Sequence, residues 1–324
     1  MRILIVLPVR QCHREMFEMA APGHELVYCL ADEVTRKLAA SADVILGNVA
    51  PELVAGSQRL RWLQLNNAGT EGFLEPGILP DGAILTNATG AYGMAISEHM
   101  IGMLFMLHKH LQDYYTQQQS CLWQRLGPMT VVGGSTTLVL GLGDIGTEFA
   151  RKMDAMGSYV IGIRKSRAPK PDFVREQYTM DALESLLPRA DVVAMSLPGY
   201  GETRHIINAR TLRLMKPGAV LINVGRGMSV DSMALCDALN EGRIGGACLD
   251  VTEPEPLPPE HPLWKAKNVL ITPHASGGFA LEATLEKILA ICGKNLAHFV
   301  KGEPLDNVVD MKTGYIVTVY GGTP

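Results

Sequence analysis

Short apolar runs alternate with polar, helix-forming stretches along the first 95 residues of the chain. Residues 31–40 have the mixed spacing of an amphipathic helix. Because the apolar runs contain few polar positions, the pattern predicts a parallel sheet that helices cover on both faces. The five strands predicted for this sheet cover residues 3–7, 25–30, 43–48, 62–67 and 83–88.

Residues 95–119 predict one long, largely buried helix, with a change of domain near residue 100. The strand pattern then restarts, with helices between most strands, and a last helix is expected at 281–300. Residues 302–310 are expected to return to the first domain, since chain ends often lie close together. The six further strands are predicted at 137–141, 159–163, 191–196, 218–224, 246–251 and 268–272.

This pattern predicts an α/β protein of two Rossmann-like, doubly wound domains with parallel sheets. Residues 1–98 and 285–324 are assigned to a flavodoxin-like substrate domain. Residues 99–284 are assigned to a dinucleotide-binding domain, since six strands that open with a glycine turn complete such a sheet.

Composition narrows the class of protein. The 47% apolar and 19% charged residues are ordinary for a soluble globular protein, and 324 residues suffice for two domains. A net charge of −4 favours neither a nucleic-acid partner nor a membrane surface. The six cysteines lack metal-binding spacing, so no metal site is expected, and reduced thiols favour a cytoplasmic protein.

A glycine-rich turn follows the predicted strand at 137–141. Gly141, Gly143 and Gly146 form the pattern G-x-G-x-x-G between that strand and a helix. In this context the glycines permit a tight turn, close approach to a pyrophosphate and close packing of helix on strand. The turn therefore predicts dinucleotide binding, and the alternative is a glycine turn in an unrelated α/β sheet.

Basic residues end the next strand, where an acid often binds the ribose hydroxyls of NAD. Arg164 lies 18 residues after Gly146 and is followed by Lys165, Ser166 and Arg167. A guanidinium group can bind a 2′-phosphate bidentately, whereas a carboxylate would repel it. We therefore expect NADP(H) to be preferred over NAD(H), the alternative being a solvated basic loop.

Three later loops carry groups suited to acid–base chemistry at the carboxyl ends of predicted strands. Arg226 stands in NVGRG, Glu253 and Glu255 follow Asp250 in an acidic loop, and His274 follows Pro273. Taken singly, each is explained by a surface turn, an acidic linker or a structural histidine. Together they would meet at the edge where open α/β sheets bind ligands.

The order of these motifs resembles that of the D-isomer-specific 2-hydroxyacid dehydrogenases over nearly the whole chain. The resemblance implies a catalytic set of Arg226, Glu255 and His274. In the family the Glu follows the strand-ending Asp by five residues and precedes a proline. This selects Glu255, although Glu253 also precedes a proline. The motifs that carry the resemblance are LQLNNAGTEGF (63–73), TNATGAYGMAISEH (86–99), GLGDIG, SLPGYGETRHIIN (196–208), MKPGAVLINVGRG, CLDVTEPEPLP, HPLWKAKNVLITPHASG and NVVD.

The reaction implied is reduction of a 2-oxo acid by NADPH to the (R)-2-hydroxy acid. His274 would donate the proton, Glu255 would orient its imidazole and favour its protonated form, and Arg226 would bind the substrate carboxylate and polarise the carbonyl. The resemblance also implies a second carboxylate site at the backbone of Asn67, Ala68 and Gly69. The active site is therefore expected in the cleft between the domains.

The resemblance implies further contacts with the cofactor, although each of these residues could instead serve only to pack a loop or a strand end. Glu98 and His99 are interpreted as structural or as indirect support for the site, because adjacent helix residues point in different directions. The family is usually dimeric, so a homodimer is expected. Two alternative functions stay open, a dinucleotide-sensing corepressor-like protein and a dehydrogenase of an oxyanion such as phosphite. The implied contacts are Asp144, Ile145, Leu197, Pro198, Val224, Gly225, Asp250, Ser276 and Gly277.

Overall fold

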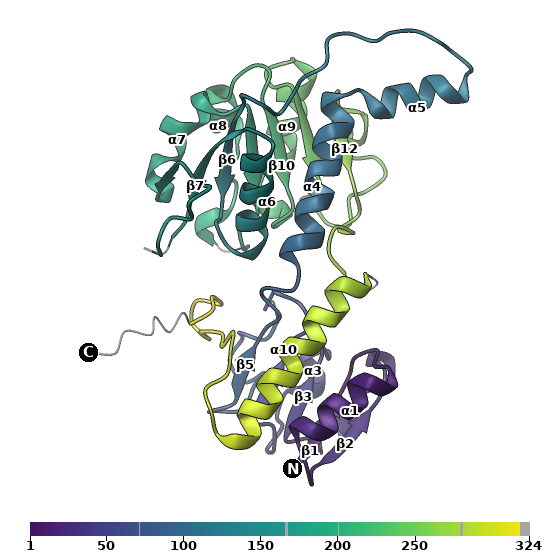
Figure 1. The fold of residues 1–324 in the computed structure, drawn as a ribbon, viewed down its shortest axis with the longest axis vertical. Coiled ribbons are helices and arrows are strands. Elements are labelled where there is room, and N and C mark those ends of the chain that lie inside the picture. The colour runs from purple at the N-terminus through teal and green to yellow at the C-terminus, as the bar shows by residue number, and fades with distance from the viewer. Residues whose placement is uncertain (71, 166–167, 200, 279–280, 318–324) are drawn as a thin grey trace. The chain divides into compact units, whose positions relative to one another are not determined.

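The computed structural model describes residues 1–70, 72–165, 168–199, 201–278 and 281–317 (Figure 1). By their internal contacts these residues form two compact units, Met1–Ala91 with Phe279–Pro324, and Tyr92–Gly278. The domain boundaries predicted from the sequence, 98/99 and 284/285, lie inside helices α4 (Gly93–His108) and α10 (Glu282–Lys301). Both helices begin before the predicted boundary, so each belongs as a whole to one unit.

The first unit contains a five-stranded parallel sheet in the order β2-β1-β3-β4-β5. All five predicted strands are confirmed, and their apolar side chains form the core around Leu4, Ile45 and Leu63. The other helices of this unit are α1 (Gln11–Ala20), α2 (Arg36–Ala40) and α3 (Pro51–Val54). The strands are β1 (Arg2–Ile5), β2 (Glu25–Tyr28), β3 (Val44–Leu46), β4 (Trp62–Gln64) and β5 (Ile84–Thr86).

The single helix predicted at 31–40 is wrong. A 3-10 turn at Ala31–Glu33 is followed by extended backbone at Val34, and α2 begins only after Thr35. The Thr35 hydroxyl accepts a hydrogen bond from the Leu38 backbone N–H at 3.2 Å, which caps a new helix. A threonine inside an amphipathic pattern therefore starts a helix here.

The segment after α10 returns to the first unit, as predicted. The Val309 backbone N–H donates to the Leu85 carbonyl at 2.8 Å, and Thr86 forms an antiparallel bridge with Val308. The Asn307 side chain donates to the Thr89 carbonyl at 2.8 Å. These contacts place the segment beside the edge strand β5.

The second unit contains a seven-stranded parallel sheet in the order β12-β11-β10-β9-β6-β7-β8. The strand order reverses between β6 and β9, the position where such sheets bind ligands. Its remaining helices are α5 (Leu111–Gln119), α6 (Asp144–Ala155), α7 (Leu183–Leu186), α8 (Ala209–Leu214) and α9 (Ser232–Asn240). The strands are β6 (Thr136–Leu140), β7 (Tyr159–Ile163), β8 (Glu176–Tyr178), β9 (Val192–Met195), β10 (Val220–Asn223), β11 (Gly246–Leu249) and β12 (Val269–Ile271).

All six strands predicted for this sheet are confirmed, and β8 is an addition that the pattern did not indicate. This strand has the sequence EQY and lies at the edge of the sheet beside β7. A short polar edge strand is not buried on both faces, so it lacks the apolar run by which the other strands were recognised.

The long buried helix predicted at 95–119 is wrong, because the chain forms two helices, α4 and α5. His110, between them, has a left-handed backbone with φ 54°. Helix α4 buries Met100 and Leu104 and packs against α6, whereas α5 has no buried residue. The polar sequence LQDYYTQQQ offers no apolar face that would hold α5 on the core.

Candidate active site

The glycine turn lies between β6 and α6, as predicted. Gly141 has φ +96°, and a Cβ at Gly146 would lie 1.9 Å from the Gly141 carbonyl oxygen. Only glycine at 146 therefore lets α6 pack this closely on the turn. A Cβ at Gly143 would meet nothing within 4 Å, so the backbone there faces open space at the start of α6. Free N–H groups at a helix N-terminus favour a phosphate.

Asp144 opens α6, and Ile145 follows it in the first turn. The Asp144 carboxylate accepts hydrogen bonds from the backbone N–H groups of Gly93, at 2.9 Å, and Tyr92, at 3.3 Å. The side chain therefore holds the start of α4. The backbone of Asp144 and Ile145 is the part placed to meet a pyrophosphate.

Arg164 follows β7 directly, and its backbone N–H donates to the Tyr178 carbonyl of β8 at 3.1 Å. Its Nε is buried and has no hydrogen-bond partner among the described residues. Lys165 is exposed and forms an ion pair with Glu202 at 3.3 Å. Ser166, also predicted to bind the cofactor, lies outside the described residues.

The loop after β10 carries Arg226. The Asn223 side chain holds this loop, accepting from the Gly225 N–H at 3.1 Å and donating to the Arg226 carbonyl at 3.0 Å. A Cβ at Gly227 would lie 1.8 Å from the Thr252 carbonyl oxygen. The loop with Arg226 therefore packs directly on the start of the acidic loop that follows β11.

Asp250 follows β11 directly and is 1% exposed. Its carboxylate accepts from the Thr272 hydroxyl at 2.6 Å, from the backbone N–H groups of Ala275 and Ser276 at 2.9 and 3.0 Å, and from the Ser276 hydroxyl. Burial opposes ionisation, but the hydrogen bonds from Ser276 and Thr272 outweigh it and hold the pKa of Asp250 below its usual value. Asp250 and Ser276 thus fix the loop that contains His274.

Glu255 and His274 form the hydrogen-bonded pair that the resemblance implied. His274 Nδ1 lies 2.6 Å from Glu255 Oε1, with 49% and 40% of the two side chains exposed. His274 has a left-handed backbone with φ 51°, and its N–H donates to the Asp250 carbonyl oxygen at 2.8 Å. With Nδ1 on Glu255, the imidazole can act on a substrate only through Nε2.

Thr272 and His99 extend the Asp250 network and were not singled out as a linked pair by the sequence. His99 Nε2 lies 3.0 Å from the Thr272 hydroxyl and 3.9 Å from Asp250 Oδ1. Glu98 is exposed and His99 is half-buried, and no hydrogen bond or ion pair joins their side chains in the part of the chain that the structure describes. The only sequence signal for Thr272 is its position just before Pro273 and His274.

The other predicted cofactor residues lie at the same edge of the sheet. Leu197 is buried after β9, and the Pro198 carbonyl accepts a hydrogen bond from the Thr203 hydroxyl at 2.8 Å. Val224 and Gly225 are buried after β10. Gly277 packs on α4, since a Cβ there would lie 2.8 Å from Cδ1 of Ile96.

Asn67, Ala68 and Gly69 follow β4 in the first unit. The Asn67 carbonyl accepts from the Ala88 N–H at 2.9 Å, and the Ala68 carbonyl accepts from the Asn87 side chain at 2.8 Å. The backbone N–H groups of Ala68 and Gly69 donate to no other described residue. They have the free donors that the predicted carboxylate site requires.

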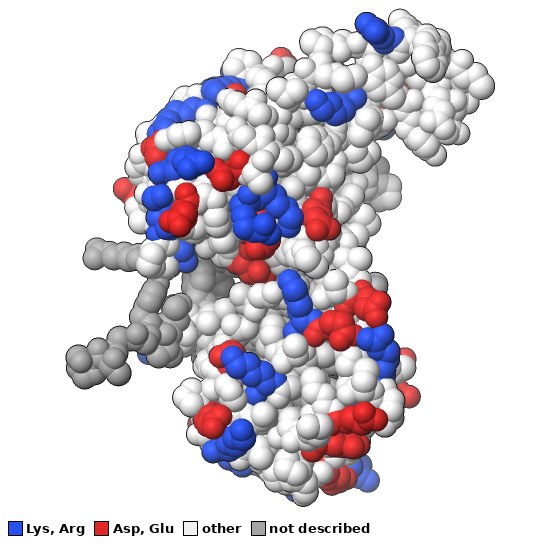
Figure 2. Space-filling model, viewed as in Figure 1, with Lys and Arg blue, Asp and Glu red and all other residues white. Residues whose placement is uncertain are grey.

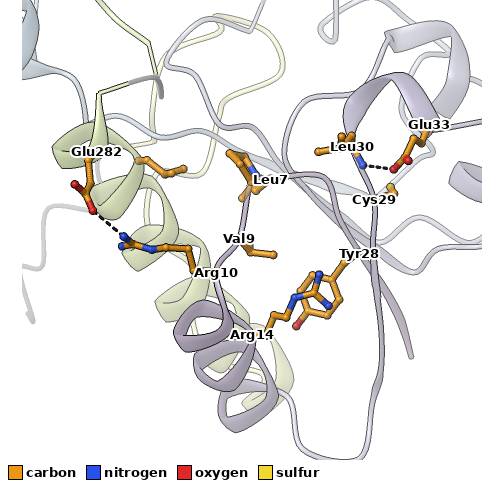
Figure 3. A pocket seen from close by; sticks show the side chains of 11 residues that line it. Leu7, Val9, Arg10, Arg14, Tyr28, Cys29, Leu30, Glu33 and Glu282 are labelled. Atoms are coloured by element: carbon orange, nitrogen blue, oxygen red, sulfur yellow. Dashed lines mark hydrogen bonds and ion pairs between the residues drawn. The ribbon is translucent and has the colours of Figure 1, made fainter.

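A cavity of about 560 Å³ opens in the first unit and contains none of the predicted site residues (Figure 3). It lies between the ends of β1 and β2, where the Arg14 guanidinium covers the Tyr28 ring at 4.2 Å. Arg10 at its rim is paired with Glu282 at 2.7 Å. The cavity has neither a glycine turn nor an acid–base pair. We therefore assign the chemistry to the edge of the second sheet.

Comparisons with known proteins agree with this geometry. A model described as "D-isomer specific 2-hydroxyacid dehydrogenase, NAD binding domain" matches residues 101–276. A glyoxylate reductase of Aeropyrum pernix is 35% identical over 240 residues, which cover 71% of this chain and 70% of that protein.

Among the described residues no helix is long and apolar enough to cross a membrane, and no cluster of His, Cys, Asp and Glu could hold a metal ion.

Two solved structures share the fold over both units. One is a D-isomer-specific 2-hydroxyacid dehydrogenase family protein of Aeromonas salmonicida, with 32% identity, a TM-score of 0.84 and coverage of 96% of this chain and 99% of that one. The other is an NADPH-dependent glyoxylate/hydroxypyruvate reductase of Sinorhizobium meliloti in complex with NADP and sulfate, with 27% identity, a TM-score of 0.78 and coverage of 97% and 99%. The chain therefore belongs to the D-isomer-specific 2-hydroxyacid dehydrogenase family and is a nicotinamide-dinucleotide-dependent oxidoreductase.

Proposed function

We propose that this enzyme reduces a small 2-oxo acid to the D-2-hydroxy acid and prefers NADPH to NADH. The observation that carries the proposal is the 2.6 Å contact between Glu255 and His274 at the ligand-binding edge of the second sheet. The names of the Aeropyrum and Sinorhizobium relatives indicate glyoxylate and hydroxypyruvate as the first substrates to test. Because all six cysteines are free thiols, we place the activity in the cytoplasm.

The residues around the glycine turn fit a dinucleotide. Gly143 leaves open space, and the N-terminus of α6 offers backbone donors for a pyrophosphate. When bound, the nicotinamide supplies the hydride that reduces the substrate carbonyl carbon. The Nε of Arg164 at the end of β7 is buried and has no partner among the residues that the structure describes. This supports a phosphate on the adjoining ribose and is the basis of the proposed NADPH preference.

The catalytic residues divide the remaining work between them. His274, with Nδ1 on Glu255, donates the proton to the substrate oxygen from Nε2 as negative charge develops there. Glu255 fixes the orientation of the imidazole and stabilises its charged form. Arg226 binds the substrate carboxylate and polarises the carbonyl. The backbone N–H groups of Ala68 and Gly69, which donate to no other described residue, are proposed as carboxylate donors of the first unit.

We also propose that the enzyme is a homodimer formed through α5 and residues 120–131. Figure 2 shows few charged side chains over this projecting part of the second unit, which Figure 1 labels α5. Exposed apolar side chains this close together indicate a protein interface. They are Leu111, Tyr115, Leu122, Trp123, Met129 and Val131, and Trp123 is fully exposed.

The dimer is tested by sedimentation of the wild type and Trp123→Asp. We expect a dimer for the wild type and a larger monomer fraction for the variant. A wild type that is monomeric at micromolar concentration would contradict this interface.

Initial rates of NADPH and NADH oxidation with a panel of 2-oxo acids test the proposed reaction. The panel contains glyoxylate, hydroxypyruvate, pyruvate and a branched 2-oxo acid, with phosphite and NADP⁺ as the oxyanion control. We expect turnover with at least one 2-oxo acid and a higher kcat/KM with NADPH. Binding of both cofactors without turnover of any compound would instead favour a sensing protein.

A further inference from the structure

His205 and Glu253 lie outside the predicted catalytic set, yet they connect the loops that carry it. His205 Nε2 lies 2.5 Å from Glu253 Oε2, and Arg204 Nη1 donates to Glu253 Oε1 at 2.6 Å. Glu253 is two residues before Glu255 in the acidic loop. Partial burial disfavours its charged form, but hydrogen bonds from His205 and Arg204 outweigh this and lower the pKa of Glu253.

The backbone of His205 holds the other loop. Its N–H donates to the Met228 carbonyl at 2.8 Å, two residues after Arg226. The pairing continues through Ile207, whose N–H donates to Ser229 at 3.1 Å and which forms a parallel bridge with Val230. One residue thus contacts the Arg226 loop through its backbone and the Glu255 loop through its side chain.

Two further features indicate a rigid connection. The Ser232 hydroxyl donates to the Glu253 carbonyl at 2.7 Å, so the acidic loop is also held through its backbone. His205 has a left-handed backbone with φ 46°, a conformation that a non-glycine residue keeps only when its surroundings fix it. This strained backbone at His205 lets its N–H contact one loop and its side chain contact another.

We propose that His205 and Glu253 form a latch that positions Glu255 against His274, with the His205 backbone anchored on the Arg226 loop. The inference rests on the proposed function, because it assigns a positioning role for the same reaction. The latch residues are not catalytic residues. Their effect on turnover passes through the orientation of Glu255, and an error of about 1 Å in such a group can cost roughly 100-fold in rate.

The test compares His205→Ala with His205→Gln in the full-length enzyme. Gln places an amide N–H near the position of Nε2 and shares with Ala the same left-handed backbone, so the pair isolates the hydrogen bond to Glu253. We expect kcat to fall about tenfold in His205→Ala with KM for NADPH unchanged, and to return to within about threefold in His205→Gln. The control is Glu184→Ala, which removes an exposed ion pair with Arg210 in the same unit and should leave kcat unchanged.

A double-mutant cycle with Glu255→Gln separates positioning from general damage to the fold. If the latch acts through Glu255, His205→Ala should cost little further rate in the Glu255→Gln background. A full, additive loss in that background would overturn the proposal. So would an unchanged kcat in His205→Ala while the wild type reduces 2-oxo acids, a result that leaves the proposed function intact.

A second readout does not depend on turnover. The imidazole proton shared by His274 and Glu255 should give a downfield proton resonance, assigned by its loss in Glu255→Gln. We expect that resonance to broaden or vanish in His205→Ala and to return in His205→Gln. If it persists unchanged in His205→Ala, the latch is refuted whether or not a substrate has been found.

Discussion

Two carboxylates follow the same strand, β11, and they have opposite surroundings. Asp250 is 1% exposed and accepts hydrogen bonds from Thr272, Ala275 and Ser276. The Glu255 side chain is 40% exposed, and its contact with His274 is its one described side-chain hydrogen bond. Asp250 holds the loop on which His274 stands, whereas Glu255 contacts the imidazole itself.

The difference separates two uses of a negative charge. A buried carboxylate surrounded by donors is fixed in its ionised form, and its interactions contribute to folding. An exposed carboxylate with free lone pairs contributes little to folding, but it can respond when the charge on its partner changes. We therefore expect substitution of Asp250 to affect mainly stability and substitution of Glu255 or His274 to affect mainly catalysis.

The largest effect is expected at His274. His274→Ala removes the proton donor, so kcat for 2-oxo acid reduction should fall about 10²–10⁴-fold. Steady-state rates at saturating NADPH measure the change, and thermal unfolding should show nearly the same Tm because the side chain is half exposed. A loss of less than about threefold would remove His274 from the role of general acid.

Asp250→Asn should lower the stability of the fold, and not only the rate of the chemical step. The amide keeps the shape of the side chain but replaces one carboxylate oxygen by an NH2 group. That group then faces either the donors of Thr272 and Ala275 or those of Ser276. We expect the free energy of unfolding to fall by about 2–4 kcal/mol, measured in urea. Wild-type stability in this variant would mean that the buried network is not what holds the His274 loop.

Asp250→Asn also tests how the stability of the fold depends on pH. Because the pKa of Asp250 is lowered in the folded state, its contribution is complete above the pKa of the unfolded chain. The contribution is lost as the pH falls through the folded pKa. The stability difference between wild type and Asp250→Asn should therefore be constant from about pH 5 to 8 and shrink below about pH 4, near the ordinary aspartate pKa.

Arg164 and Lys165, at the end of β7, also differ in their surroundings, and we expect smaller effects on the rate from their substitution. Arg164 has a buried Nε without a described partner, whereas Lys165 is paired with Glu202 at the surface. Arg164→Ala should lower kcat/KM for NADPH about tenfold and change that for NADH little, because only NADPH carries the 2′-phosphate. Lys165→Ala should cost about two- to threefold. Equal losses with both cofactors would contradict the role of Arg164.

The fold could be predicted where the apolar pattern is dense. Eleven of the twelve strands follow from it, since both faces of each parallel sheet are covered. The pattern does not indicate β8, a polar edge strand. It also predicted a single helix across His110, where a left-handed residue ends the buried helix and a solvated one begins.

That a carboxylate of the acidic loop would meet His274 could be predicted because both follow parallel strands, whose ends meet at one edge. The choice of Glu255 over Glu253 came from the family resemblance. Contacts that depend on side-chain geometry could not be predicted from the sequence. Nothing in the sequence indicates that Asp144 holds the start of α4 or that Glu253 contacts His205, 48 residues away. These contacts are made by individual side chains, and the pattern of apolar and polar residues does not indicate them.

The contrast between the two carboxylates is tested most directly by measuring kcat and the free energy of unfolding together for Glu255→Gln and Asp250→Asn. We expect Glu255→Gln to lose at least about tenfold in kcat with a change in stability below about 1 kcal/mol. Asp250→Asn should lose about 2–4 kcal/mol of stability. If Glu255→Gln instead destabilised the fold while retaining full kcat, the assignment of Glu255 and His274 as the reactive pair would be wrong.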